Sequence, residues 1–539
     1  MVDYNNSNHS TYSRWASEVE IKNSLNKIDI NEKAVCGGIP LFYENSGVYV
    51  DPTDAHTTIV GGTGSKKTRN IGMPALQLFT RAGESFVATD PKGELYERTL
   101  PVLKDQGYNI FILNLRDPQS SNCWNPFMIP YKFYKTGQYD KAIELVTDMS
   151  NCMMQDSLSD KEPYWHNSAI DLLLGLIITL FECAKEDQIH LKSLRTLRRQ
   201  AFKNDLNSDN NTRDYTPTFI SEKFLNYLDK SVFIYSMLNG TAEVCDTTRG
   251  CIVSVFDQAM RPFFSQNNLV DMLSGNEIDM GTIGKTKTAI FLVMPDENTV
   301  YHRLISVFVK QCYTALIFEA QKQQSRKLPV RVNFLLDEFS SLPPISDFPS
   351  MITASRSRNI RFHLIIQSLN QLHKRYGYDA ETIRGNCENW IFLHSREISL
   401  LNELVELSGK KNEEEYLVSV SMLQTLSKEK GEALIFHKRL HPFIANLMDI
   451  DQYCPITHNE GHIEYPKNKQ QVIDVFDFGK FCKGKDSYFF SQLFDGKKIT
   501  KEEYYMLNDD DENFEPIFTS RIPSEDDNIK EIVKCIGDI

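Results

Sequence analysis

The sequence lacks the cysteine motifs of metal and redox sites. Its eleven cysteines form no Cys-X-X-Cys motif and no spacing that is typical of a zinc site. In a chain of 539 residues, such isolated cysteines are typical of reduced and mostly buried thiols. We therefore expect a cytosolic protein without a disulfide framework.

Segments that would insert into a membrane are also missing from the sequence. The first ten residues are polar and rich in asparagine, so no signal peptide is predicted. The most apolar stretch, residues 172–181, is short and is flanked by Asp171 and Glu182. A membrane-spanning helix needs about 20 apolar residues, so the sequence predicts a buried helix here. We expect a soluble protein with no integral membrane segment.

Positive charge is not in excess. The chain has 59 lysines and arginines against 72 acidic residues, which gives a net charge of −13. This balance argues against a protein that binds nucleic acid over its whole surface. It does not exclude a small basic surface, because counterion release depends on local charge. Residues 356–361 and 373–376 are the candidates for such a surface, and the alternative for each is an ordinary solvated helix end.

Short apolar runs rich in β-branched residues alternate with helical patterns along much of the chain. This alternation is typical of parallel βαβ units, and the uninterrupted apolar runs indicate strands covered on both faces. We predict an α/β fold with a doubly wound, mostly parallel sheet. The predicted strands are residues 57–60, 85–89, 109–114, 289–293, 332–336, 362–366, 390–394 and 433–436.

The alternation stops between about residues 132 and 278. Helical patterns at 142–152, 165–184, 219–239 and 249–262 surround a polar loop at 203–217. They predict an inserted all-α domain, and the alternative is that these helices simply cover the main sheet. Because the length predicts two or three domains, we divide the chain by residue number. An N-terminal extension covers 1–36, the α/β domain 37–131 and 279–460, the inserted all-α domain 132–278, and a C-terminal appendage 461–539.

The C-terminal appendage carries acidic clusters at residues 509–512 and 525–527. Such clusters are usually a solvated face, and a docking surface for a basic partner is the alternative.

A glycine-rich loop follows the first predicted strand of the α/β domain. Residues 61–68 read Gly-Gly-Thr-Gly-Ser-Lys-Lys-Thr and lie before a helical pattern, which is the layout of a Walker A loop. Backbone N–H groups of such a loop wrap phosphates, its lysine reaches the β- and γ-phosphates, and its hydroxyl holds Mg²⁺. A simple turn that caps a helix is the alternative. The predicted phosphate-binding residues are Gly61, Thr63, Gly64, Ser65, Lys66, Lys67 and Thr68, and Thr68 is also a predicted metal ligand.

Lys66 occupies the position of the last glycine in the Walker A pattern. The backbone approaches phosphate closely there, and glycine's conformational freedom can be required. We interpret Lys66 as damage to the loop, so the sequence predicts an ATPase with a deviant Walker A motif whose turnover is in question.

A second acidic motif ends the strand predicted at residues 332–336. Asp337 and Glu338 follow it directly, as in a Walker B element. Asp337 would hold Mg²⁺, and Glu338 would polarise the attacking water. Acidic residues are common at strand ends, so the motif gains weight from sharing a domain with the glycine-rich loop. We predict that the two motifs lie on adjacent strands.

Two further residues are candidates for catalysis. Gln367 ends the strand predicted at residues 362–366 and is placed to sense the γ-phosphate. Arg356 follows Asp337 by nineteen residues and could reach the nucleotide of a neighbouring subunit. Arg358 and Arg384 are weaker candidates for the same role. Arg356 and Arg358 could instead be basic residues that stabilise the end of a helix.

The order of these motifs resembles that of the TraG-type coupling proteins of conjugative transfer, which share a RecA-like motor core with the FtsK and HerA translocases. The resemblance covers about residues 37–450. The matching segments are the glycine-rich loop and residues 88–94, 114–117, 122–127, 162–165, 336–340, 355–360, 367–368 and 383–387.

This resemblance implies a RecA-like P-loop domain that binds ATP and Mg²⁺ and hydrolyses ATP. It implies a hexameric ring with DNA in the central pore, and an all-α domain that faces a relaxase or another protein substrate. It assigns Glu338, Arg356 and Gln367 as catalytic residues and Asp337, with Thr68, as a metal ligand. The family's usual N-terminal membrane helices are not recognised in the sequence. We therefore expect a cytoplasmic protein that is at most peripheral to a membrane secretion complex.

Two functions are compatible with these observations. The first is an ATP-dependent DNA translocase of a conjugative or type IV secretion-like system. The second is a degenerate P-loop protein that recruits DNA or protein for a mobile element or a defence system, without robust ATP hydrolysis. Lys66 favours the second, whereas the complete set of Asp337, Glu338, Arg356 and Gln367 favours the first.

Overall fold

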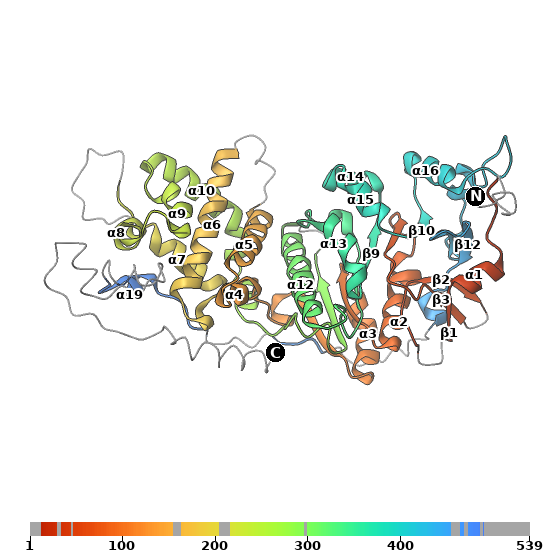
Figure 1. Cartoon of the computed structure of the whole chain (residues 1–539), viewed down its shortest axis with the longest axis horizontal. Coiled ribbons are helices and arrows are strands. Elements are labelled where there is room, and N and C mark those ends of the chain that lie inside the picture. Colours follow the sequence, from red (N-terminus) through yellow and green to blue (C-terminus); the bar gives the residue numbers. More distant parts are fainter. Residues whose placement is uncertain are drawn as a thin grey trace, which may run out of the picture. The chain divides into compact units, whose positions relative to one another are not determined.

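The computed structural model describes residues 12–29, 34–44, 47–154, 163–203, 216–295, 299–453, 464–467, 473–485 and 489. The chain divides into two compact units (Figure 1). The α/β unit comprises Met1–Trp124 and Glu277–Lys469, and the helical unit comprises Asn125–Asn276 and Gln470–Ile539. The acidic clusters predicted at 509–512 and 525–527 lie outside the described residues.

A nine-stranded sheet forms the centre of the α/β unit, in the order β12-β11-β10-β4-β9-β8-β5-β7-β6. Strands β11 and β12 are antiparallel to their neighbours, and the other pairings are parallel. All eight predicted strands are present, and β12 was not predicted. The strands are β4 (Thr57–Gly61), β5 (Ser85–Asp90), β6 (Asn109–Asn114), β7 (Thr288–Val293), β8 (Val332–Leu336), β9 (Ile360–Ile366), β10 (Asn389–His394), β11 (Glu432–His437) and β12 (Phe443–Asn446).

The strand order corrects one prediction. The glycine-rich loop follows β4 and the Asp337-Glu338 motif follows β8, but β9 lies between these two strands. The motifs are therefore not on adjacent strands. Chain order does not determine which strand is inserted between two others, so the sequence pattern could not exclude this arrangement. The consequence is that Gln367, at the end of β9, lies between the two motifs.

Helices cover both faces of this sheet. Every residue of β4, β5, β7, β8 and β9 is buried, and successive side chains of a strand point to opposite faces. Continuous apolar strands therefore require cover on both sides. The helices of the unit, apart from α1, are α2 (Met73–Ala82), α3 (Glu94–Asp105), α12 (His302–Lys322), α13 (Phe348–Ser355), α14 (Leu369–Tyr376), α15 (Asp379–Gly385), α16 (Ile398–Ser408), α17 (Val420–Gln424) and α18 (Ile450–Tyr453).

A small antiparallel sheet lies at the start of the chain. It has the order β1-β3-β2, with β1 at Asn26–Asp29, β2 at Pro40–Glu44 and β3 at Gly47–Val50, and helix α1 (Glu18–Ser24) precedes it. Ile21, Leu25 and Ile28 belong to the same apolar core as the large sheet. The described residues of the predicted extension at 1–36 are therefore part of the α/β unit.

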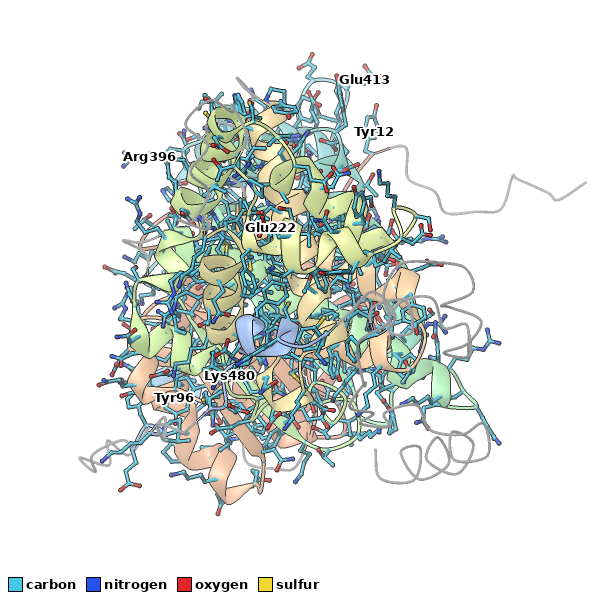
Figure 2. The ribbon with its side chains drawn as sticks, turned by 90° about the vertical axis from the view of Figure 1, so that its left-hand side faces the viewer. Tyr12, Tyr96, Glu222, Arg396, Glu413 and Lys480 are labelled. Carbon is cyan, nitrogen blue, oxygen red and sulfur yellow. The ribbon has the colours of Figure 1, made fainter. Side chains whose placement is uncertain are left out.

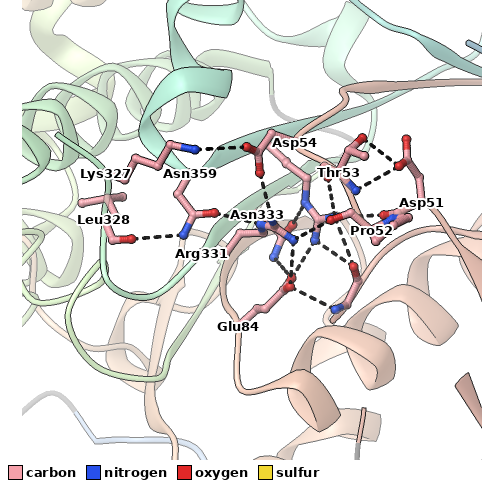
Figure 3. A network of polar contacts seen from close by, with 12 residues as sticks. Asp51, Pro52, Thr53, Asp54, Glu84, Lys327, Leu328, Arg331, Asn333 and Asn359 are labelled. Atoms are coloured by element: carbon pink, nitrogen blue, oxygen red, sulfur yellow. Dashed lines mark hydrogen bonds and ion pairs between the residues drawn. The ribbon is translucent and has the colours of Figure 1, made fainter. Parts of the chain in front are cut away.

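Buried charged groups join β5, β8 and β9 near their amino ends (Figure 3). The guanidinium of Arg361, in β9, is 1% exposed and donates to Glu84 Oε2 at 2.6 Å and to Asn333 Oδ1 at 2.8 Å. Arg331 lies 3.4 Å from Glu84 and 2.7 Å from Asp54. Burial would raise the pKa of Glu84, but Arg361 and Arg331 reverse this effect and lower it. These contacts connect the amino ends of β8 and β9, whose carboxyl ends are followed by Asp337-Glu338 and by Gln367.

The described residues of the helical unit contain no strand. The helix predicted at 219–239 is broken, because Asp229 Oδ1 accepts from the Ser231 N–H at 2.7 Å in a turn that interrupts it. The predicted loop at 203–217 lies almost entirely outside the described residues. The helices are α4 (Met128–Lys135), α5 (Tyr139–Met154), α6 (Pro163–Cys183), α7 (Leu191–Ala201), α8 (Phe219–Lys223), α9 (Phe233–Ala242), α10 (Asp246–Phe264), α11 (Asn267–Met272) and α19 (Phe478–Cys482).

The apolar stretch at residues 172–181 lies in α6, and all ten residues are buried, as predicted. Among the described residues, α6 is the one helix long and apolar enough to cross a membrane, and most of its apolar stretch is buried.

The described residues after 460 do not form a separate appendage. Residues 473–485 pack in the helical unit, where the Phe476 N–H donates to Ser193 Oγ at 3.0 Å. The exposed Lys480 lies within α19 (Figure 2). Tyr465 instead packs in the α/β unit, where its hydroxyl donates to Glu97 at 2.8 Å and its ring lies 5.2 Å from that of Tyr96.

Candidate nucleotide-binding site

A cavity of about 620 Å³ lies at the carboxyl ends of β4, β8 and β9. This edge of a parallel sheet is the usual location of ligand sites in α/β folds. The cavity is lined by Gly62, Thr63, Gly64, Ser65, Lys66, Lys67, Thr68, Arg69, Asp90, Pro91, Lys92, Glu94, Leu95, Thr299, His302, Asp337, Glu338, Ser341 and Gln367. It thus contains six of the seven residues predicted to bind phosphate, together with both acidic residues and the glutamine.

The glycine-rich loop surrounds a buried lysine ammonium. Lys67 Nζ donates to the carbonyl oxygen of Gly61 at 2.6 Å, and the Lys67 residue is 7% exposed. Gly61 ends β4 and does not line the cavity. Gly64 has a φ of 76°, in the left-handed region that favours glycine. After the loop a π-helical turn, Thr68–Gly72, leads directly into α2.

Lys66 keeps the backbone conformation that glycine would supply. Its φ is 62°, which costs a non-glycine residue about 1 kcal/mol or more. Its carbonyl accepts from the Asn70 N–H at 2.8 Å, and its ammonium lies 3.5 Å from Asp449. The lysine is therefore held in a strained conformation that glycine would adopt freely.

Carboxylates crowd the opposite side of the cavity. Asp337, at the end of β8, is buried, and burial together with the charge of Glu338 raises its pKa to about 7. Burial likewise raises the pKa of Asp90 to about 6. The raised pKa values mean that the ionised form of each carboxylate is destabilised in the cavity. A bound cation would stabilise the ionised form of both. Asp337 and Thr68 could hold Mg²⁺ here.

Gln367 positions Glu338. The Gln367 side-chain amide donates to both carboxylate oxygens of Glu338 at 2.8 Å. Glu338 has a φ of 56°, so its backbone turns sharply directly after Asp337, whose carboxylate accepts from the Glu338 N–H at 2.9 Å. A carboxylate oriented in this way could take a proton from water inside the cavity.

Two buried polar atoms of cavity residues have no hydrogen-bond partner among the described residues. They are Ser65 Oγ in the glycine-rich loop and Nδ1 of His302, which begins α12. Unpaired buried polar groups are costly, and a polyanionic ligand would supply an acceptor for the Ser65 hydroxyl. The residues present therefore fit a nucleotide with a divalent cation.

Arg356 does not line the cavity. It lies in the turn before β9, whereas Gln367 follows that strand, and seven residues of extended chain span about 23 Å. Its guanidinium is half-buried and pairs with Glu388 at 2.7 Å. Arg356 could thus serve only the cavity of another copy. Arg358 is bound to the carbonyl of Arg326 at 3.3 Å, and Arg384 is buried against Glu381 and Glu403.

The structure corrects part of the predicted basic surface. Arg361 is buried in β9 and cannot contact nucleic acid. In the second stretch, His373 pairs with Glu381 at 3.2 Å and the Tyr376 ring stacks on Phe339, while Lys374 and Arg375 are exposed. The burial of Arg361 could not be predicted from the local sequence, because its partner Glu84 is 277 residues away.

The cavity also contains residues that were not proposed from the sequence, among them Asp90, Thr299 and His302. Asp90 ends β5 and lines the cavity. It begins the Asp-Pro-Lys-Gly-Glu segment, and this motif could have indicated it as a site residue. Thr299 and His302 lie before and at the start of α12, where no motif marks them.

Comparison with known proteins places the chain in a family. The family model for conjugative DNA transfer in the type IV secretory system matches residues 14–430. The chain is 22% identical over 382 residues to the protein VirD4 of Rhizobium rhizogenes and 23% identical over 388 residues to that of Rhizobium radiobacter, with 70% of this chain covered in each case. The matches cover 52% and 51% of those relatives, so the chain spans about half their length.

Solved structures of the plasmid coupling protein TrwB share the fold. The complex with ADP and Mg²⁺ has a TM-score of 0.58 at 16% identity and covers 81% of this chain and 94% of TrwB. The complex with the ATP analogue ADPNP has a TM-score of 0.57 at 15% identity, with 81% and 93% covered. The predicted RecA-like fold and the resemblance to coupling proteins are thereby confirmed. The chain belongs to the family of type IV secretory system proteins for conjugative DNA transfer.

Proposed function

We propose that this protein is an ATP-driven DNA translocase of a conjugative transfer system and works as a ring of identical subunits. The observation that carries the proposal is the convergence of Lys67, Asp337, Glu338 and Gln367 on one cavity. A motor needs a phosphate-binding cation, a metal ligand, a group that activates water and a group that senses the γ-phosphate. One residue of each kind is present.

Each residue has a distinct role in this proposal. Lys67 exchanges its bonds to loop carbonyls for the β- and γ-phosphates, and backbone N–H groups of the loop bind the remaining oxygens. Thr68 and Asp337 hold Mg²⁺, which would neutralise charge on the phosphate oxygens. Glu338 accepts the proton of the attacking water while Gln367 keeps its carboxylate oriented. The complex of TrwB with ADP and Mg²⁺ supports these cofactors.

The assembly is proposed from family membership and the position of Arg356. We propose a hexamer with DNA in its central pore, in which Arg356 of one subunit completes the cavity of the next. A relaxase or another protein substrate would bind through the helical unit. The protein would work in the cytoplasm, at or beside the membrane secretion complex.

A second candidate function is favoured by Lys66 alone. A strained loop with a lysine in the glycine position could bind nucleotide without turning it over. The protein would then recruit DNA or protein substrates as a degenerate P-loop subunit of a mobile element or a defence system.

Phosphate release with and without DNA separates the two functions. We expect ATP hydrolysis by the wild type and a loss of at least about 100-fold in Glu338→Gln, because the amide cannot accept a proton. ATP binding, measured by calorimetry, should persist in Glu338→Gln and serves as the control. Equal background rates in both proteins, with ATP bound, would establish the degenerate subunit.

The Lys66→Gly variant is expected to hydrolyse ATP at least as fast as the wild type. Glycine adopts a φ near 62° without strain and removes a side chain from the loop. Lys67→Ala should instead weaken ATP binding by at least about 100-fold, since it removes a charge-assisted contact to phosphate. Steady-state hydrolysis and ATP titration measure the two effects. A large loss of turnover in Lys66→Gly would mean that Lys66 itself acts in the reaction.

A further inference from the structure

A second cavity of about 380 Å³ shares Lys66 and Arg69 with the nucleotide cavity. It is lined by Lys66, Arg69, Asn70, Glu429, Lys430, Leu447, Asp449 and Asp451. The glycine-rich loop therefore has charged neighbours that do not line the nucleotide cavity. These neighbours precede β11 or follow β12, the last two strands of the large sheet.

Asp449 contacts Lys66 and Arg69, the two cationic residues that line both cavities. Its carboxylate accepts from Arg69 Nε at 3.0 Å and from Arg69 Nη2 at 2.5 Å, a bidentate pair. The ammonium of Lys66 lies 3.5 Å from Asp449 Oδ2. Asp451 also pairs with Arg69 and lies 3.8 Å from Arg98, and among the described residues no ion pair joins it to Lys66.

The backbone around Asp449 is held firmly. Leu447, Met448 and Ile450 are buried, so Asp449 lies between anchored neighbours. The Leu447 N–H donates to the carbonyl of Gly431 at 2.8 Å, and a Cβ at Gly431 would lie 2.1 Å from the Leu447 carbonyl oxygen. The carboxylate therefore has a fixed location relative to the loop.

We propose that Asp449 is a positioning residue that holds the Lys66 ammonium away from the phosphate-binding position. The proposal rests on the proposed function, because it assigns a role at the same nucleotide site. Lys66 can then occupy the glycine position without adding a second lysine to the phosphates. Asp449 thus compensates for the departure from the Walker A pattern, and the two residues form a coupled pair.

Removal of the carboxylate frees a long cationic side chain next to Lys67. A free ammonium at this position can reach a bound diphosphate, and hydrogen bonds between charged groups are the strong ones. Asp449→Asn should therefore tighten ADP binding about fivefold, an effect of the size of one partly exposed ion pair. The gain should disappear when Lys66 is absent.

Calorimetric titration of the full chain with ADP and Mg²⁺ tests this coupling in four proteins: the wild type, Lys66→Gly, Asp449→Asn and the double variant. The fivefold gain is expected in the wild-type background, and a change of less than about twofold in the Lys66→Gly background. Asp451→Asn is the matched control, because it removes a neighbouring charge that pairs with Arg69 and Arg98 rather than with Lys66, and it should change ADP affinity less than twofold. Equal effects of Asp449→Asn in both backgrounds, or equal effects of Asp449→Asn and Asp451→Asn, overturn the proposal.

A second measurement needs no nucleotide. Reductive methylation followed by mass spectrometry reports the accessibility of each lysine amine, and the exposed Lys92 serves as the internal standard. Lys66 should be modified several-fold faster in Asp449→Asn than in the wild type or in Asp451→Asn. An unchanged rate overturns the positioning role. A faster rate in a protein that binds no ADP would instead reject the proposed ATPase while the positioning of Lys66 stands.

Discussion

Arg356→Ala is expected to lower ATP hydrolysis by about 10³-fold or more while ATP affinity stays within about twofold of the wild type. An arginine supplied by a neighbouring subunit acts on charge that develops in the transition state, so its loss changes turnover more than binding. Arg356 lies at the edge of the sheet opposite its own cavity, so it cannot act there. Arg358→Ala, in the same turn, is the matched control and should keep most of the activity.

Mixing two inactive proteins tests whether Arg356 acts between subunits. An Arg356→Ala subunit keeps Glu338, and a Glu338→Gln subunit keeps Arg356, so a mixed ring contains some complete sites. With random assembly about a quarter of the interfaces should be complete. Partial recovery of phosphate release is therefore expected. If the two proteins assemble together, as shown by a tag on one of them, and no activity returns, Arg356 does not act in trans.

Arg361→Met is expected to lower the free energy of unfolding by about 3–5 kcal/mol. The change leaves Glu84 buried without its closest cation, since the Arg361 guanidinium lies 2.6 Å from the Glu84 carboxylate and is 1% exposed. Denaturant titration followed by circular dichroism measures the loss. Arg358→Met, which removes a partly exposed arginine three residues earlier, should change stability by less than about 0.5 kcal/mol.

The double variant Glu84→Gln, Arg361→Met separates loss of the pair from isolation of one charge. Removing both charges leaves no uncompensated ion, so the double variant should be more stable than Arg361→Met alone. A double variant that is less stable than either single change would mean that packing, and not the stranded carboxylate, dominates the effect.

The elements of the site were predictable because each is encoded in a short contiguous segment. The loop at Gly61–Thr68, the acidic end of β8 and Gln367 at the end of β9 each combine a buried strand with a polar terminus. Parallel strands bring their carboxyl ends to one edge of the sheet, so local patterns were enough to place these residues near one another.

What the sequence determined by itself is therefore the inventory of strands, the motifs at their ends and the family they indicate. Only the tertiary structure decided that β9 lies between β4 and β8, that Arg361 is buried, and that Lys66 is paired with a carboxylate 383 residues away. Each of these depends on strand order or on contacts between distant segments. Local hydrophobic period and turn chemistry carry no information about such partners, because those signals arise from neighbours a few residues apart.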